Sequence, residues 1–196
     1  MNQVKCGALI RELRRERGMT QRALAESIGV GDKAVSKWER GLGCPDVSLL
    51  GALSRAFGVK IENLLEGSLE PNRADGGNMK KVKFYACPQC GSLLTSTGTP
   101  EISCCGRRLE PLAPAPADGA HQPRVEWTDG EYYVTLPHEM SKEHYIGFAA
   151  CAAYDRVLFI RLYPEQDAAF RMPAMRGGSL YLYCSRHGLM QADIGR

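Results

Sequence analysis

The stretch that most constrains the fold lies near the middle of the chain, where four cysteines fall in two pairs. Cys87 and Cys90 form a Cys-x-x-Cys-Gly knuckle, and Cys104 and Cys105 are adjacent and followed by glycine. The segment between the pairs is polar and rich in turn residues, so it cannot build an apolar core large enough to fold by itself. A metal ion held by four thiolates would supply the missing stability, and iron and zinc both suit such a tetrahedron. Four protein ligands leave no open position, which predicts a structural or electron-relay site.

The histidines predict a second metal site. All four lie between residues 121 and 187, and a Cys-x-x-His-Gly stretch ends the set. Four imidazoles and one thiolate in this part of the chain suggest a single iron site with four nitrogen ligands and one sulfur ligand. The expected ligands are His121, His138, His144, Cys184 and His187.

The N-terminal third predicts a compact helical module. Apolar residues recur at helical spacing from Cys6 to Leu13, and Gly18 is placed to end that helix. Thr20 can cap a second helix over 21–28, and a third is expected over 32–39. Residues 1–66 hold 11 Lys/Arg and 8 Asp/Glu, whereas the remaining residues hold 14 of each. The excess positive charge therefore lies in a module with a helix-turn-helix pattern, which favours a nucleic-acid partner.

The rest of the chain predicts linkers and short strands. Residues 67–83 contain glycines, a proline and little to bury, and residues 113–120 are rich in Ala and Pro. Between residue 121 and the C-terminus, alternating β-like runs are separated by turn residues, which favours a small antiparallel sandwich. The expected strands are Arg124–Trp127, Tyr132–Leu136, Tyr145–Ala153, Arg156–Tyr163 and Leu180–Cys184.

The helical module resembles a known family of DNA-binding domains. Its residues "MTQRALAESIGVGDKAVSKWERG" and "CPDVSLLGALSRAFGV" resemble the phage-repressor-like, xenobiotic-response-element family. The resemblance implies that the third helix enters the major groove of double-stranded DNA and that Gln21 contacts phosphate. It implies base-reading positions at Asp32, Lys33, Ser36 and Lys37. The alternative is a fold that has lost DNA affinity and serves as a dimerisation or protein-binding module.

The two metal-site regions resemble a second family. The stretch "KFYACPQCGSLLTSTGTPEISCCGRRLEPL" resembles the desulforedoxin-like domain, which holds one iron in a four-cysteine site. The stretches "HQPRVEWTDGEYYVTLPHEMSKEHYIGF" and "LYLYCSRHGLM" resemble the catalytic domain of superoxide reductase. Together, residues 80–190 are similar to desulfoferrodoxin, the two-iron form of that enzyme. The resemblance implies two irons per chain, reduction of superoxide to hydrogen peroxide, and an electron donor such as rubredoxin. Zinc at the four-cysteine site stays an alternative.

One departure from the family bears on function. A Glu-Lys pair usually precedes the first histidine, and this chain has Gly119-Ala120 there. Because that lysine attracts superoxide, its absence implies slower reduction or a substitute cation, for which Lys142 is the candidate. Two interpretations follow. The protein is a superoxide reductase coupled to DNA binding, or it is a redox-sensing transcription regulator that uses the iron domains without significant turnover. The least favoured interpretation is a repressor that binds only zinc in its C-terminal part.

The expected architecture is multidomain. It comprises an all-α helix-turn-helix head (1–66), a linker (67–83), a desulforedoxin-like four-cysteine domain (84–112), a second linker (113–120) and an all-β immunoglobulin-like antiparallel sandwich (121–196). Both resemblances imply a homodimer. The charged N-terminus does not fit a signal peptide, and the longest apolar run, Tyr145 to Tyr154, is too short to span a bilayer. A cytoplasmic protein without a membrane partner is therefore expected.

Overall fold

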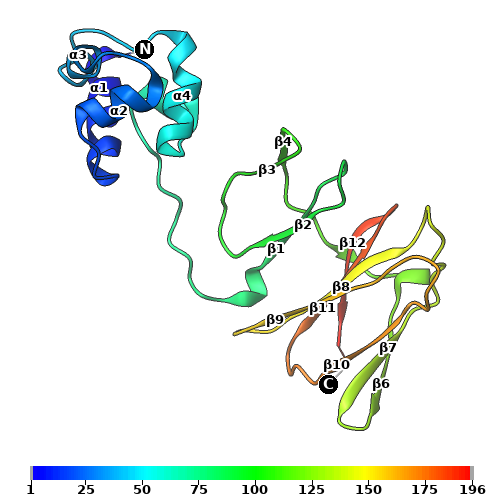
Figure 1. The fold of residues 1–196 in the computed structure, drawn as a ribbon. Helices are drawn as coiled ribbons and strands as arrows, with labels where there is room; N and C mark the ends of the chain where they lie inside the picture. The colour runs from blue at the N-terminus through cyan, green and yellow to red at the C-terminus, as the bar shows by residue number, and fades with distance from the viewer. Residues whose placement is uncertain (1, 195–196) are drawn as a thin grey trace. The chain divides into compact units, whose positions relative to one another are not determined.

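A computed structural model describes residues 2–194, and the chain divides after Pro71 into two compact units (Figure 1). The first unit is built from helices and the second mainly from strands, as the sequence predicted. We call them the helical unit and the β unit. Among the described residues, no helix combines the length and the apolar character needed to cross a membrane.

The helical unit contains five α-helices whose ends follow from capping residues. The Asn2 side chain accepts hydrogen bonds at the first helix, and Thr20 accepts from the backbone N–H of Ala23 at the second. Gly29 and Gly58 end two helices in the left-handed conformation that glycine adopts at little cost. The helices are α1 (Gln3–Glu16), α2 (Gln21–Ile28), α3 (Asp32–Glu39), α4 (Val47–Phe57) and α5 (Ile61–Glu66).

A buried ion pair joins three of these helices. Glu39, the last residue of α3, accepts hydrogen bonds from Arg14 Nε at 2.6 Å and from Arg14 Nη2 at 3.0 Å. Gln21 Nε2, at the start of α2, donates to the same carboxylate at 2.8 Å. The apolar residues of α1 to α5 form one core around Ile10, Val35 and neighbouring side chains. The pair therefore fixes the end of α3 against the rest of the unit.

The β unit has a two-layer sandwich at its centre. A five-stranded sheet in the order β5-β12-β11-β8-β9 lies against a three-stranded sheet in the order β10-β7-β6 (Figure 1). The pairings are antiparallel except for the short β5, which pairs in parallel with β12. The strands are β5 (Ala115–Pro116), β6 (Arg124–Thr128), β7 (Glu131–Thr135), β8 (Ile146–Ala152), β9 (Val157–Arg161), β10 (Ala169–Pro173), β11 (Ser179–Cys184) and β12 (Gly188–Asp193).

Strand β8 is buried along its whole length. One of its faces, with Ile146 and Ala149, packs into the core between the two sheets. Its other face, with Phe148 and Ala150, packs under Phe84 in a second core on the outer side of the five-stranded sheet. Phe84 comes from the segment of the chain that precedes the sandwich. Because its two faces pack into different cores, β8 is shared by both.

The four-cysteine segment forms two small hairpins next to this second core. They pair β1 (Lys83–Ala86) with β2 (Leu93–Ser96) and β3 (Ile102–Cys104) with β4 (Arg107–Leu109). Tyr85, Cys87 and Leu109 form a core cluster of only three buried residues. So small a core agrees with the expectation that a metal ion supplies part of the stability.

Both segments expected to be linkers contain some regular structure. The first includes a 3-10 turn, η1 (Met79–Lys81), and the backbone N–H of Met79 donates to the Tyr154 carbonyl at 2.9 Å. The second includes β5 and begins another 3-10 turn, η2 (Gly119–His121). Backbone hydrogen bonding does not depend on apolar side chains, which is why the Ala/Pro composition did not predict β5.

Candidate metal centres and DNA-reading helix

The structure gathers the four histidines and Cys184 into one cluster, which we call the histidine-cysteine cluster. Each residue offers one ligand atom, and the five atoms lie within 4.8 Å of one another. The contributing elements are η2 for His121, the β7–β8 loop for His138 and His144, the end of β11 for Cys184 and the β11–β12 turn for His187.

The short distances in the cluster identify the atoms that face inward. His187 Nδ1 lies 3.2 Å from the Nε2 atoms of both His121 and His144. Cys184 Sγ lies 3.4 Å from His187 Nδ1 and 3.5 Å from His138 Nε2. Metal–imidazole bonds of about 2.1 Å at right angles would place neighbouring nitrogens roughly 3 Å apart. The spacing therefore fits a common metal ion, and the donor set of four imidazoles and one thiolate fits iron.

Burial favours the protonation state that metal binding needs. Cys184 is fully buried, whereas His121 and His138 are 7% and 8% exposed. Burial lowers the pKa of His121 and of His138, so that both imidazoles are held neutral. His187 is exposed, which leaves the cluster open to solvent on that side.

Backbone contacts hold the loops that supply these ligands. The backbone N–H of Ser185 donates to the Tyr145 carbonyl at 2.9 Å, and the N–H of Tyr145 donates to Ser185 Oγ at 3.1 Å. A register shift lies between Tyr183 and Cys184, just before the last pair of the β8–β11 ladder, and Gly188 turns the chain back with φ of 81°. The His144 loop and the Cys184 turn are thus tied together.

The structure also gathers Cys87, Cys90, Cys104 and Cys105. Their Sγ atoms lie within 4.8 Å of one another, and Cys90 Sγ is 3.5 Å from Cys104 Sγ. Metal–sulfur bonds of about 2.3 Å in a tetrahedron would place the sulfurs roughly 3.8 Å apart. Cys105 adopts a left-handed φ of 50°, which turns its side chain toward the same centre as that of its neighbour. The spacing fits a tetrahedral ion.

A thiolate is favoured at one of these cysteines. Hydrogen bonding by the Ser92 side chain and backbone lowers the pKa of Cys90 to about 6. Cys90 Sγ and Ser92 Oγ lie 3.1 Å apart. A deprotonated sulfur is the form that binds a metal ion.

Helix α3 presents the expected base-reading positions. Asp32, Lys33 and Lys37 are exposed, Ser36 is half-buried, and the apolar side of the helix is held in the core by Val35 and Trp38. The Asp32 carboxylate accepts a hydrogen bond from the Lys33 backbone N–H at 2.8 Å, at the helix end where a negative charge is favourable.

Two other expected site residues have partners inside the protein. The Gln21 amide donates to Glu39, which leaves a phosphate contact by Gln21 as a prediction. Lys142 Nζ lies 3.5 Å from Glu165 Oε1, with both side chains largely exposed. Its role as a substitute cation also remains a prediction.

Glu139 is a further residue at the histidine-cysteine cluster that the sequence did not predict. Its backbone carbonyl contacts His138 Nδ1, and its carboxylate contacts His144 Nδ1. Two carboxylates, those of Glu139 and Glu143, lie between His138 and His144 in the sequence, and their spacing does not indicate which of them contacts a ring.

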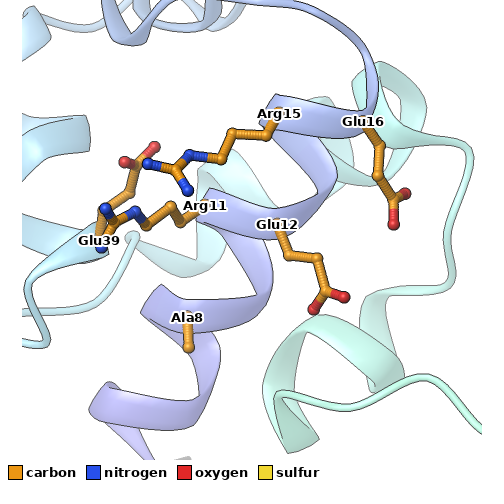
Figure 2. A pocket seen from close by; sticks show the side chains of 6 residues that line it. All are labelled: Ala8, Arg11, Glu12, Arg15, Glu16 and Glu39. Atoms are coloured by element: carbon orange, nitrogen blue, oxygen red, sulfur yellow. The ribbon is translucent and has the colours of Figure 1, made fainter.

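A surface hollow of about 620 Å³ lies elsewhere, on the helical unit. Figure 2 shows the side chains of Arg11 and Arg15 reaching from α1 toward Glu39, while Glu12 and Glu16 point away from it. The hollow is lined by charges of both signs and shares no residue with the two candidate metal sites.

Comparisons with known proteins divide the chain in the same way. Residues 10–64 match the helix-turn-helix family model. The HTH-type transcriptional activator BcrR of Enterococcus faecalis is 37% identical over 79 residues, which are 39% of this chain and 39% of that protein. The chain thus spans about two fifths of that activator's length.

The β unit has relatives of another kind. Desulfoferrodoxin of Clostridium acetobutylicum is 26% identical over 122 residues, which are 58% of this chain and 97% of that protein. The crystal structure of superoxide reductase from Treponema pallidum covers 57% of this chain and 97% of its own, with a TM-score of 0.50 and 18% identity, and so shares the fold. The chain therefore joins an N-terminal helix-turn-helix domain to a region that is similar in sequence to desulfoferrodoxin and shares the fold of superoxide reductase.

Proposed function

We propose that the protein is a superoxide reductase-like enzyme coupled to sequence-specific DNA binding. The observation that carries the proposal is the convergence of five donor atoms within 4.8 Å, from residues up to 66 positions apart. His121, His138, His144, Cys184 and His187 would hold one iron. A ferrous ion held there would supply the one electron that, with two protons, converts superoxide to hydrogen peroxide.

The protein's own residues prepare this chemistry. The buried His121, His138 and Cys184 exclude water from the inner side of the cluster, whereas the exposed His187 leaves a route for a small anion. The thiolate of Cys184 places a negative charge in a site of low dielectric, which favours electron loss from a bound metal. An external donor, such as rubredoxin, would return the electron.

The four-cysteine site would hold a second iron, as the homology to desulfoferrodoxin suggests. All four positions of a tetrahedron would be occupied by Cys87, Cys90, Cys104 and Cys105. The site would therefore stabilise the two small hairpins or relay electrons. Zinc fits the same four thiolates.

Helix α3 would read the major groove through Asp32, Lys33, Ser36 and Lys37. The exposed lysines, one turn apart, share a face, and Gln21 would contact phosphate. A homodimer would present two such helices to paired half-sites. Because it binds DNA, the protein would act in the cytoplasm.

A second candidate function is a redox-sensing transcription regulator. It is favoured by Gly119-Ala120 in place of the family's Glu-Lys pair, and by the ion pair that Lys142 makes with Glu165. In this function the iron state biases DNA binding without significant turnover of superoxide.

Metal analysis and stopped-flow kinetics separate the two functions. The wild-type protein should contain about two irons per chain and consume superoxide faster than the uncatalysed reaction. Cys184→Ser should lose this activity, whereas Cys90→Ser, which removes a thiolate from the other site, should keep a substantial part. If wild type and Cys184→Ser both react at the uncatalysed rate, the enzyme proposal is wrong.

The regulatory function has its own test. Binding to duplexes from the protein's own promoter region is measured with the protein reduced and then oxidised. A sensor should change its affinity several-fold between the two states. Equal affinity would refute sensing, and no specific binding in either state would refute DNA recognition.

A further inference from the structure

We infer that Glu139 is a positioning residue that fixes two imidazoles of the histidine-cysteine cluster through two different groups. Its backbone carbonyl holds the ring of His138, and its side-chain carboxylate holds the ring of His144. The inference rests on the proposed metal centre, because it concerns how two of its ligands are oriented.

The contacts determine which nitrogen of each ring faces the cluster. A carbonyl and a carboxylate oxygen can only accept hydrogen bonds, so in each neutral imidazole Nδ1 must carry the proton. Nε2 then keeps its lone pair. His138 Nε2 lies 3.5 Å from Cys184 Sγ, and His144 Nε2 lies 3.2 Å from His187 Nδ1. Both free lone pairs therefore point to the place where the five donor atoms meet.

Among the residues that the structure describes, neither of the other two imidazoles has a hydrogen bond to a carboxylate, although the backbone of Asp118 interacts with the ring of His121. His187 presents Nδ1 to the cluster and so cannot use it for an outer hydrogen bond. The nearest carboxylate to His121 Nδ1 is that of Asp118, at 4.0 Å and with 88% of its side chain exposed. That separation is too long for a hydrogen bond. Within residues 2–194, His144 is the cluster histidine whose ring is hydrogen-bonded to a carboxylate.

The β7–β8 loop is built to bring Glu139 back to His144, five positions later in the chain. Ser141 Oγ accepts from the backbone N–H of His144 at 3.1 Å, which closes the loop on itself. The carbonyl of Met140 accepts from the N–H of Glu165 at 2.6 Å, and Met140 Sδ lies 3.3 Å from the Ile146 nitrogen. These contacts hold Met140, the neighbour of Glu139, through both its backbone carbonyl and its side chain.

The carboxylate should strengthen metal binding as well as orient the ring. A negative charge on the outer nitrogen makes the inner one a better electron donor, and loss of such an outer partner typically lowers metal affinity about 10–100-fold. The Glu139 side chain is 58% exposed, whereas that of His144 is 12% exposed. Solvent weakens the effect of the carboxylate charge, so we expect a loss near the lower end, about tenfold.

NMR of the histidine ring nitrogens in the metal-free full-length protein tests the orientation directly. In wild type, both His138 and His144 should carry the proton on Nδ1. In Glu139→Ala, His144 should become a mixture of the two neutral forms, whereas His138 should be unchanged because the backbone carbonyl remains. The unchanged His138 signal also shows that the loop is still folded. If His144 keeps its proton on Nδ1 in the variant, the inference is overturned.

Cobalt(II) titration in competition with a chelator tests the affinity. The binding phase that disappears in Cys184→Ser belongs to the histidine-cysteine cluster. Glu139→Ala should weaken that phase about tenfold, and Glu139→Gln, which keeps the shape without the charge, should weaken it less. Glu143→Gln is the matched control, because it removes a charge next to His144 and should leave the phase unchanged. Equal affinity of wild type and Glu139→Ala would overturn the inference.

Failure of the proposed metal centre can be distinguished from failure of the positioning role of Glu139. If no phase is lost in Cys184→Ser, the proposed metal centre is wrong, while the metal-free NMR experiment still decides whether Glu139 orients His144.

Discussion

Replacing Arg14 with methionine should strongly destabilise the helical unit, because it leaves a buried carboxylate without the cation that is hydrogen-bonded to it. The Glu39 side chain is 3% exposed, and Arg14 supplies two of the three described hydrogen bonds to it, at 2.6 and 3.0 Å. In Arg14→Met the hydrogen bond from the Gln21 amide and the nearby charge of Arg11 would remain, but no cation would be hydrogen-bonded to the carboxylate. Removing one partner of a buried pair costs about 3–5 kcal/mol. We therefore expect a loss of this size in the free energy of unfolding.

The loss should depend on pH. Burial by itself would raise the pKa of Glu39, but hydrogen bonds from Arg14 and Gln21 outweigh it and lower the pKa below its ordinary value. Because the pKa is lower in the folded state, the pair stabilises fully above the unfolded pKa of about 4.3, and its contribution falls as the pH drops through the folded value. The difference between wild type and Arg14→Met should therefore shrink in acid.

Urea unfolding followed by far-ultraviolet circular dichroism measures this loss, since the described α-helices all lie in the helical unit. Arg22→Met is the control, because it breaks an ion pair with Glu26 in which both side chains are more than half exposed. Such a pair contributes about 0–1 kcal/mol. If Arg14→Met costs no more than Arg22→Met, the reasoning from burial is refuted. The double variant Arg14→Met with Glu39→Met should recover much of the loss, because no buried charge remains.

Three further perturbations follow from the same structure. Lys33→Ala should weaken binding to the specific duplex about tenfold and relax the preference at the base pair that Lys33 reads, as titration of duplexes with single-base changes would reveal. An unchanged base preference would argue against base reading by Lys33. Gly7→Ala should destabilise the helical unit by about 3 kcal/mol in the same urea unfolding assay, because the added Cβ would lie 1.9 Å from the Trp38 carbonyl oxygen. Gly51→Ala in α4 is the control: its Cβ would make only an ordinary contact, so the variant should be neutral or stabilising. Lys142→Ala should change the superoxide rate by less than about twofold, because its charge is already paired, and a larger fall would identify it as the substitute cation.

The helical unit was the part most readily predicted from sequence. Thr20 and Gly29 mark the ends of α2, and the expected helices over 21–28 and 32–39 coincide with α2 and α3. Capping residues act through local hydrogen bonds, so they can be recognised without knowledge of the tertiary structure. The buried ion pair could not be recognised in this way, since Arg14 and Glu39 are 25 residues apart.

The sandwich was predicted as a class, but several of its strands were missed. The sequence of β10, AFRMP, ends in proline, and that of β12, GLMQAD, has no β-branched residue. Both form because neighbouring strands offer unpaired backbone groups: β10 pairs with β7, and β12 pairs with β11. Tertiary pairing of this kind overrides the weak local preference for a strand.

The side chains of the two candidate metal sites could be predicted from the sequence, but the residues that hold them in position could not. Cysteine and histidine spacing pointed to the nine side chains that the structure brings together in two clusters. Metal binding by them remains a prediction. Glu139 was missed because its contact with His144 depends on how the loop closes, through Ser141 and Met140, rather than on a spacing that composition reveals.

Because β8 is shared by two cores, the β unit should unfold cooperatively. The residues of β8 contribute to the core between the sheets and to the core under Phe84, so neither layer can open without exposing apolar surface of the other. Residues 72–194 should therefore melt in a single cooperative transition. In hydrogen exchange, the amides of Ile146–Ala152 should be among the last to exchange. Stripping metal from the four-cysteine hairpins should accordingly lower the melting temperature of the whole sandwich.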